Sequence, residues 1–148
     1  SAASDVYKRQ VGISSVAPKN TVEHIYADAY ILLAMQPTAL FNALADPTRL
    51  RAIMLIRSEG EVCVCELTHA LNESQPKISR HLAYLRESQV VCARREGTWM
   101  HYRLDANLPS WAAGIIAEAH EQLRESSPYN ADLEKLVRMK DRPERDCA

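Results

Sequence analysis

Two cysteines, Cys63 and Cys65, lie one residue apart in the segment EVCVCEL at residues 61–67. Thiolates bind thiophilic ions, with the sulfur about 2.3 Å from the ion if zinc is taken as a guide. Free cysteines are also common as small buried side chains of a hydrophobic core. Taken alone, the pair favours the core interpretation, so its position in the fold must decide between a core role and a metal site.

The backbone conformation of this segment decides whether both sulfurs can bind one ion. In a helix, residues i and i+2 point about 200° apart, whereas in an extended segment they point to the same side. We expect a short helix over 63–71, which disfavours a direct disulfide between Cys63 and Cys65. Joint ligation then needs an extended segment or an unwound first turn. A helix start also favours the thiolate form that a metal ion requires.

The third ligand of such an ion stays open. The candidates, in order, are solvent or a small exogenous thiol, then Cys147, then Cys92. We interpret Cys92 as an exposed strand residue. His69 lies four residues after Cys65, and we regard this spacing as coincidence rather than as a catalytic pair. Four further ionisable residues are interpreted as surface residues: His101, His120, Glu118 and Glu121.

The 148-residue chain, with 47% apolar and 25% charged residues, suits one domain with a hydrophobic core. Residues 74–103 carry six Lys/Arg against two Asp/Glu, a charge of +4, whereas residues 1–73 carry −2 and residues 104–148 carry −3. A basic middle suits a face presented to a polyanion, although unrelated helix faces also produce such a pattern. There is no membrane-spanning run and no secretory signal, so we expect a cytoplasmic protein with reduced thiols and no membrane partner.

Apolar periodicity predicts a mainly α fold with one β-hairpin. Residues 1–22 show no period and are expected to be a disordered tail, followed by a short helix over 23–35. Asp46 is the expected N-cap of a central helix, with Pro47 at its first position and Gly60 as its left-handed C-cap. Helices are expected at 37–44, 47–57, 63–71, 75–88, 109–125 and 129–140, with the hairpin at 90–104.

The helices at 63–71 and 75–88 are joined by a tight turn, which indicates a helix-turn-helix. Together with the hairpin they predict a winged helix-turn-helix, and the unpartnered apolar stripe of the helix at 109–125 predicts a homodimer. The exposed half of the second helix and the hairpin suit the major groove, phosphates and a minor groove of double-stranded DNA. The predicted DNA-binding residues are Ser74, Gln75, Lys77, Ser79, Arg80, His81, Arg94 and Arg95, with Arg103 the weakest candidate.

Four stretches carry a family resemblance: LADPTRLRAI, EVCVCEL, SQPKISRHLAYLRES and RREGTWMHYRL. Each resembles the ArsR/SmtB family of metal-responsive repressors, and the cysteine motif is similar to that of its arsenic-sensing branch. The resemblance implies a homodimeric repressor that leaves operator DNA when As(III) or Sb(III) binds Cys63 and Cys65. Cys147 stays a further ligand candidate because the C-terminal tail could bring it to the site. Two departures are Thr68, where some members have a third cysteine, and Gln89, where glycine is frequent.

The resemblance begins after Met35, which suggests Met35 as the natural start. We therefore expect an N-terminal extension at 1–35, a DNA-binding and dimerisation domain at 36–127 and a C-terminal tail at 128–148.

Other functions remain open at this point. A dithiol sensor of oxidants or persulfides would have the same fold. Sensing of cadmium, lead or zinc is disfavoured because the N-terminal segment lacks cysteine and AEAHEQL lacks the ligand spacing of zinc-binding relatives. A thiol oxidoreductase or a metal-delivery protein would need a different scaffold, such as a βαβ unit.

Overall fold

The computed structural model describes residues 35–142, and the chain divides into two units, Ser1–Ala34 and Met35–Ala148. Three expectations fall outside the described residues: the tail at 1–22, nearly all of the helix at 23–35, and Cys147. Within the described range, no helix has both the length and the apolar composition that crossing a membrane requires.

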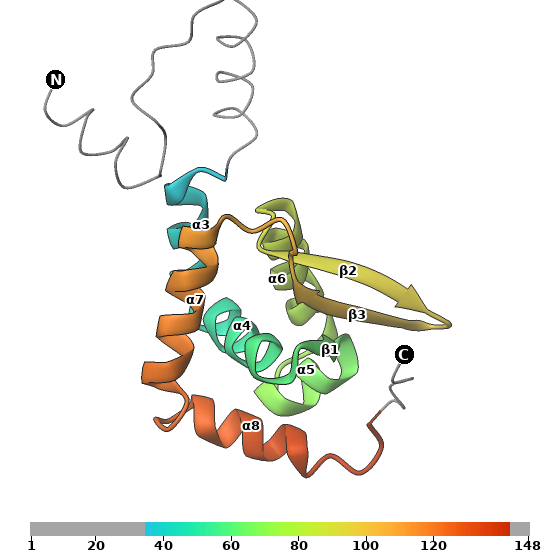
Figure 1. Cartoon of the computed structure of the whole chain (residues 1–148). Helices are drawn as coiled ribbons and strands as arrows, with labels where there is room; N and C mark the ends of the chain where they lie inside the picture. The colour runs from blue at the N-terminus through green and yellow to red at the C-terminus, as the bar shows by residue number, and fades with distance from the viewer. Residues whose placement is uncertain (1–34, 143–148) are drawn as a thin grey trace, which may run out of the picture. The chain divides into compact units, whose positions relative to one another are not determined.

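The described residues form a winged helix-turn-helix with flanking helices (Figure 1). Helices α5 and α6 form the helix-turn-helix, and the β2–β3 hairpin forms the wing. The predicted hairpin and all the helices predicted after residue 36 are present; the helix at 37–44 has the predicted ends, and the others have shifted ends. In chain order the elements are α3 (Pro37–Leu44), α4 (Pro47–Glu59), β1 (Glu61–Cys63), α5 (Val64–Leu71), α6 (Gln75–Glu87), β2 (Val91–Glu96), β3 (Trp99–Leu104), α7 (Ser110–Leu123) and α8 (Tyr129–Val137).

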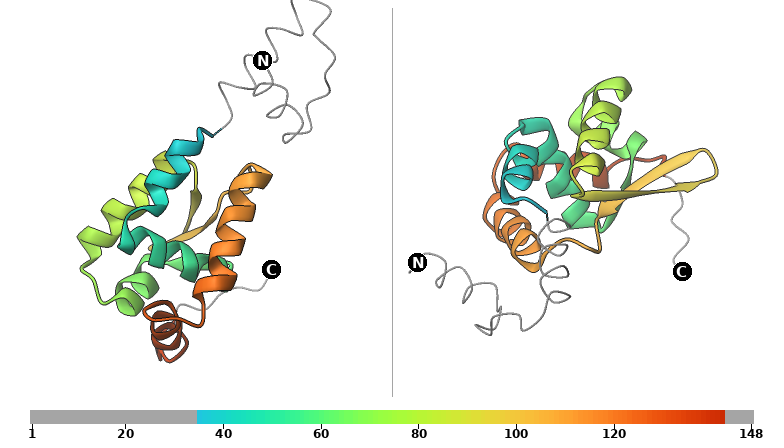
Figure 2. Two further views of the ribbon diagram at one scale, coloured as in Figure 1. Left: turned by 90° about the vertical axis from the view of Figure 1, so that its left-hand side faces the viewer. Right: turned by 90° about the horizontal axis from the view of Figure 1, so that it is seen from above.

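Helix α4 lies at the centre of the helices and packs against α3, α5, α6, α7 and α8 (Figure 2). Asp46 caps its N-terminus as predicted, because the carboxylate accepts a 2.9 Å hydrogen bond from the backbone N–H of Arg49. Gly60 is its C-cap, as predicted, with a φ of 80° and a ψ of −47°, so the expected left-handed helical conformation is not adopted. Local signals at both ends therefore set the length of the central helix.

The sheet is antiparallel and has the strand order β1-β3-β2. Strand β1 pairs with β3 so that Cys63 lies opposite His101. This strand replaces the start of the helix expected over 63–71. Three residues show too little alternation to be recognised as a strand, and the segment is extended because β3 supplies its hydrogen-bonding partner.

Helix α8 is bound firmly to the rest of the fold. Its Leu136 is fully buried in the common core, and its Asp132 is only 1% exposed. Arg51 of α4 donates two hydrogen bonds, of 2.7 and 2.6 Å, to the two carboxylate oxygens of Asp132. Helix α8 also packs against α5, so it lies beside the first helix of the helix-turn-helix.

Gln89 carries a backbone conformation that glycine would adopt more easily. It follows α6 with a φ of 60°, and left-handed conformations cost an L-residue energy. We expect Gln89→Gly to raise the free energy of unfolding by roughly 0.5–1 kcal/mol in urea denaturation. Asn72→Gly, at a φ of 54°, is the control and should gain less, because asparagine tolerates this region. A loss of stability in Gln89→Gly would contradict the prediction.

Candidate functional site

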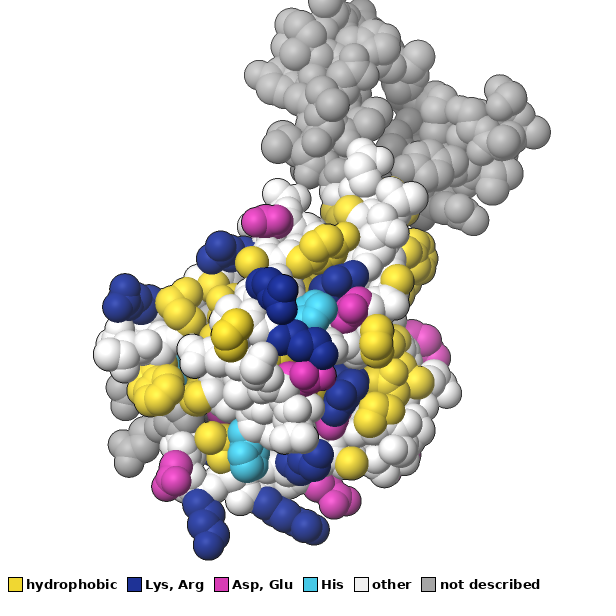
Figure 3. All heavy atoms as spheres, turned by 180° about the vertical axis from the view of Figure 1, so that it is seen from behind, with side chains coloured by type: hydrophobic (Ala, Val, Ile, Leu, Met, Phe, Trp, Pro, Cys, Tyr) yellow, Lys and Arg dark blue, Asp and Glu magenta, His cyan; other side chains and the backbone are white. Residues whose placement is uncertain are grey.

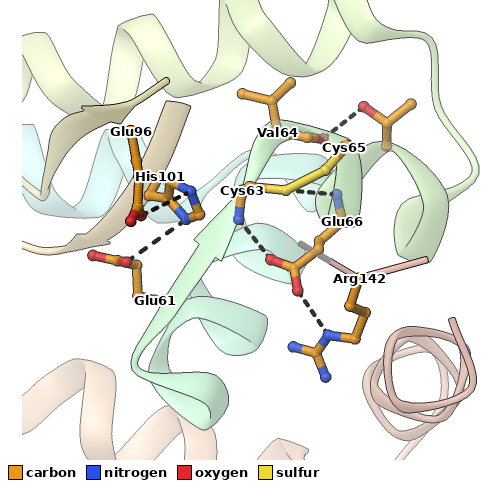
Figure 4. Close-up of a disulfide and its surroundings, with 9 residues drawn as sticks. Glu61, Cys63, Val64, Cys65, Glu66, Glu96, His101 and Arg142 are labelled. Atoms are coloured by element: carbon orange, nitrogen blue, oxygen red, sulfur yellow. Dashed lines mark hydrogen bonds and ion pairs between the residues drawn. A yellow bond between two sulfur atoms is a disulfide. The ribbon is translucent and has the colours of Figure 1, made fainter. Parts of the chain in front are cut away.

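The two cysteines meet where a strand passes into a helix (Figure 4). Cys63 has extended backbone angles (φ −86°, ψ 163°) and is the N-cap of α5, whereas Cys65 lies inside α5. Their Cα atoms are 5.5 Å apart and their sulfurs are joined in a disulfide. The expectation that a direct disulfide is disfavoured is therefore wrong, because only one of the two residues is helical. This turn brings both sulfurs to one place, as joint ligation of an ion requires.

Glu66 holds Cys63 through a reciprocal pair of hydrogen bonds (Figure 4). The backbone N–H of Glu66 donates to Sγ of Cys63 at 3.4 Å, and the backbone N–H of Cys63 donates to Oε2 of Glu66 at 2.7 Å. This is a capping box with cysteine in place of serine or threonine. The C-x-x-E spacing of Cys63 and Glu66 is the signal in the sequence that could have indicated this capping role of Glu66. Sγ of Cys63 accepts this hydrogen bond while it is also bonded to Sγ of Cys65.

Arg142 ties the segment after α8 to the same carboxylate. Its Nε donates to Oε1 of Glu66, and its Nη2 donates to Oε2 of Glu59, both at 2.7 Å. Burial opposes the charge of Arg142, but the hydrogen bonds to Glu59 and Glu66 outweigh burial and raise its pKa. The guanidinium thereby joins the end of α4, the start of α5 and the C-terminal segment.

His101 is buried directly opposite Cys63, with its side chain 3% exposed. Its Nδ1 lies 3.7 Å from Oε1 of Glu61, and its Nε2 lies 3.7 Å from Oε2 of Glu96. The expectation that His101 is a surface residue is wrong, because side chains of the two neighbouring strands, Glu61 of β1 and Glu96 of β2, lie against its ring. Of the other three residues expected at the surface, Glu118 and Glu121 are exposed, whereas His120 is half-buried.

Arg94 of the wing is engaged by two carboxylates. Its Nε donates to Oε2 of Glu61 at 2.9 Å, and its Nη1 donates to Oε2 of Glu96 at 2.8 Å. The hydrogen bond from Arg94 lowers the pKa of Glu61 in spite of burial. The contribution of this pair to stability is therefore present above the ordinary pKa of Glu61 and is lost as the pH falls through the lowered value. The pair joins the two edge strands, β1 and β2, across β3.

The predicted DNA-binding residues of α6 lie around the part of its surface that is not buried in the core. Ile78, Leu82 and Leu85 are buried, as predicted. Figure 3 looks onto the side that carries α6 and shows Lys and Arg side chains gathered across it, with carboxylates between them. Ser74, Gln75, Ser79 and Arg80 are exposed, Lys77 pairs with Glu73 at 2.7 Å, and His81 is half-buried with Nδ1 3.7 Å from Asp46.

The remaining candidates lie on the wing and do not join the cysteine pair. Arg95 is exposed, and its Nε donates to the carbonyl of Gly97 at 3.0 Å. Cys92 is half-buried on β2, separated from β1 by β3, and accepts a 3.3 Å hydrogen bond from Arg103. This hydrogen bond raises the pKa of Arg103. Between residues 35 and 142, no group of three or more His, Cys, Asp or Glu side chains is arranged to hold a metal ion.

Comparison with known proteins gives consistent matches. Residues 46–91 match the profile of the bacterial regulatory protein, arsR family. The chain is 57% identical over 83 residues to the arsenical resistance operon repressor of Escherichia coli K12, covering 56% of this chain and 71% of that protein. It is 49% identical over 111 residues to the arsenic resistance transcriptional regulator ArsR2 of Pseudomonas putida, covering 74% and 94%. The solved structure of HlyU from Vibrio cholerae aligns with a TM-score of 0.53 and 29% identity, over 58% of this chain and 89% of that chain.

The Glu66 network predicts two unequal losses of stability. Glu66→Ala leaves the buried N–H of Cys63 without this acceptor and also removes a partner of Arg142, so we expect a loss of about 2–3 kcal/mol. Arg142→Ala keeps the capping box and should cost about 1 kcal/mol. Urea denaturation of the reduced protein measures both losses. Equal losses would show that the capping box adds nothing to the Arg142 contact.

Proposed function

Because the chain belongs to the ArsR family of bacterial transcriptional regulators, we propose that it represses an arsenic-resistance operon and leaves its operator when As(III) or Sb(III) binds Cys63 and Cys65. Membership of this family makes the protein a DNA-binding repressor rather than an enzyme. The observation that carries the proposed inducer site is the meeting of two sulfurs at the entry to the helix-turn-helix.

The set of donor atoms suits a trivalent metalloid better than zinc or cadmium. Trivalent arsenic and antimony are thiophilic and bind three ligands in a pyramid, so two cysteines leave one position to fill. A structural zinc site takes four ligands, and residues 35–142 hold no cluster of that kind. The binding form is the reduced pair, because sulfurs joined to each other cannot both act as thiolate ligands.

Ligation of Cys63 acts on both DNA-binding elements. In this proposal the metalloid draws Sγ of Cys63 away from the N–H of Glu66, and losing such a cap costs a helix about 0.5–2 kcal/mol. Helix α5 packs against α6, so a weakened start of α5 disturbs the support of the recognition helix. Strand β1 pairs with β3, so a displacement of Cys63 also reaches the wing.

The third ligand is solvent or a small thiol in this proposal, with Cys147 as the next candidate. Cys147 follows Arg142 by five residues, and five residues span at most about 18 Å. Arg142 contacts Glu66, the residue after Cys65, so the anchor of the tail lies beside the cysteine pair. Cys92 ranks last because β3 separates its strand from β1.

Double-stranded operator DNA receives α6 in its major groove. The amide of Gln75 and the guanidinium of Arg80 suit adenine and guanine edges, and Ser74 at the helix N-terminus suits a phosphate. Five further residues complete the proposed contacts. Lys77, Ser79 and His81 belong to α6, and Arg94 and Arg95 belong to the wing, where Arg94 must first leave Glu61.

A second copy of the chain completes the DNA-binding unit. Phe41 of α3 is 55% exposed, which is unusual for a large apolar side chain of a small domain. Helix α7 presents the partly buried Trp111 and Ile115. A symmetric homodimer that covers α3 and α7 would bury these side chains and place two copies of α6 on one operator. Binding to operator DNA in turn implies a cytoplasmic location, where thiols stay reduced.

One observation supports a second function, the sensing of oxidants or persulfides by the same dithiol. The sulfurs of Cys63 and Cys65 are joined in a disulfide at the junction of β1 and α5. Oxidation would then act at the same two sulfurs without any metalloid.

DNA release is the direct test of the inducer. The affinity of the reduced full-length protein for its own promoter DNA is measured by fluorescence anisotropy, with arsenite, antimonite, cadmium and peroxide added in turn. We expect arsenite and antimonite to weaken binding roughly tenfold or more, and the variant carrying Cys63→Ser and Cys65→Ser to bind DNA without responding. Release by peroxide alone would favour the redox function, and release of the double variant by arsenite would reject the proposed site.

Two single variants in the same assay identify the third ligand. An unchanged response of Cys147→Ser assigns the position to solvent or a small thiol, and a lost response assigns it to the tail. Cys92→Ser is the matched control and should respond as the unmodified protein does.

Arg80 is expected to contribute sequence-specific affinity. Arg80→Ala should weaken operator binding by about 1–3 kcal/mol and reduce the preference for the operator over random DNA. Arg57→Ala, an exposed arginine in the last turn of α4, is the control and should change the affinity little. Equal effects of the two substitutions in anisotropy titrations would show that α6 does not read bases at this position.

A further inference from the structure

A groove of about 460 Å³ opens beside Cys65. Cys65, Thr68 and His69 of α5 form one wall, Gln75 at the start of α6 forms another, and Trp99 and Met100 of β3 form the third. The groove therefore lies between the cysteine pair, the recognition helix and the wing, which are the three parts of the proposed regulatory mechanism.

The exposure of the two cysteines indicates on which side a bound metalloid has its free ligand position. Cys63 is 0% exposed, whereas Cys65 is half-buried and lines the groove. An atom bound to both sulfurs is enclosed on the Cys63 side by β1 and by the capping box. Its remaining ligand position faces the groove on the Cys65 side.

The groove is larger than a hydroxide ligand needs, and its lining includes apolar residues that a hydroxide would not contact favourably. A water molecule takes about 30 Å³ in the liquid, so the groove has room for a substituent of many atoms. Trp99, which is 48% exposed, and Met100 both line the groove, and their side chains point to opposite faces of β3. An aromatic ring or a thioether suits flat apolar groups. Thr68, His69 and Gln75 supply hydrogen-bonding groups on the other walls.

We propose that this groove holds the organic substituent of a monosubstituted trivalent arsenical, R–As(OH)₂, whose arsenic binds Cys63 and Cys65. The inference rests on the proposed function and specifies its ligand class. Each thiol gives up its proton and replaces one hydroxyl group, so two As–S bonds form, two As–O bonds break and two water molecules leave. Arsenic stays trivalent and the As–C bond is unchanged.

The position of the substituent gives it a direct effect on DNA binding. It lies against Gln75, a proposed base contact, and against Trp99, which pairs with Glu96 at the tip of the wing. An inorganic metalloid acts on these elements only through the cap of α5 and the pairing of β1. An aromatic arsenical should therefore release DNA at a lower concentration than arsenite does.

The test uses the reduced full-length protein with phenylarsine oxide and arsenite as probes. Trp111→Phe leaves Trp99 as the sole tryptophan of the chain, so its emission reports on the groove. Phenylarsine oxide should shift or quench this emission, and arsenite should change it less. Trp99→Ala should weaken phenylarsine oxide binding roughly tenfold and leave arsenite binding unchanged, whereas Trp99→Phe should restore most of the affinity.

The outcomes separate this inference from the function on which it rests. Equal phenylarsine oxide affinities of the Trp99→Ala variant and the unmodified protein, with arsenite still releasing DNA, would overturn the groove assignment alone. If neither compound binds through Cys63 and Cys65, the proposed inducer site fails as well. A loss of affinity for both compounds in Trp99→Ala would show a general disturbance of the wing and would also overturn the assignment.

Discussion

The paired hydrogen bonds between Cys63 and Glu66 are the constraint on which the rest of the site depends. Cys63 directs its N–H and its sulfur toward Glu66, while its place in β1 pairs it with His101 of β3. One residue thus ends a strand and begins a helix, so the wing and the helix-turn-helix share a boundary there. Arg142 reaches the same Glu66 from beyond α8. A ligand on Cys63 acts where three parts of the fold meet.

Local signals in the sequence predicted most of the helices, because caps depend on residues that are close in the chain. Asp46 and Gly60 bracket α4, and Gly97 turns the hairpin with a φ of 58°. Pairings between distant segments were not predictable in this way. Strand β1 is extended only because β3 lies beside it, so Cys63 was taken as helical and His101 as exposed. The cysteine pair and the α6 face followed from residue types and spacing, whereas the Arg142 contact and the groove at Trp99 required the folded arrangement.

The basic segment 74–103 is less available to DNA than its charge of +4 suggests. Lys77 is paired with Glu73, and Arg94 is paired with Glu61 and Glu96. A phosphate that recruits Arg94 must displace Glu61, which belongs to β1 and lies two residues before Cys63. In the proposed mechanism, DNA at the wing and a metalloid at the cysteines therefore impose competing requirements on one short strand.

The strength of the cap limits how far one site can shift the DNA equilibrium. A ligand shifts an equilibrium only by its difference in affinity for the two states. Loss of an N-cap costs about 0.5–2 kcal/mol and each 1.4 kcal/mol is tenfold, so one cap lowers DNA affinity by at most about thirtyfold. In a symmetric dimer both recognition helices engage the operator, so the two losses multiply to as much as several hundredfold, on the order of twice the free energy of one cap. The loss of two caps, each of modest free energy, can thus release DNA while Leu67 of α5 stays buried in the core.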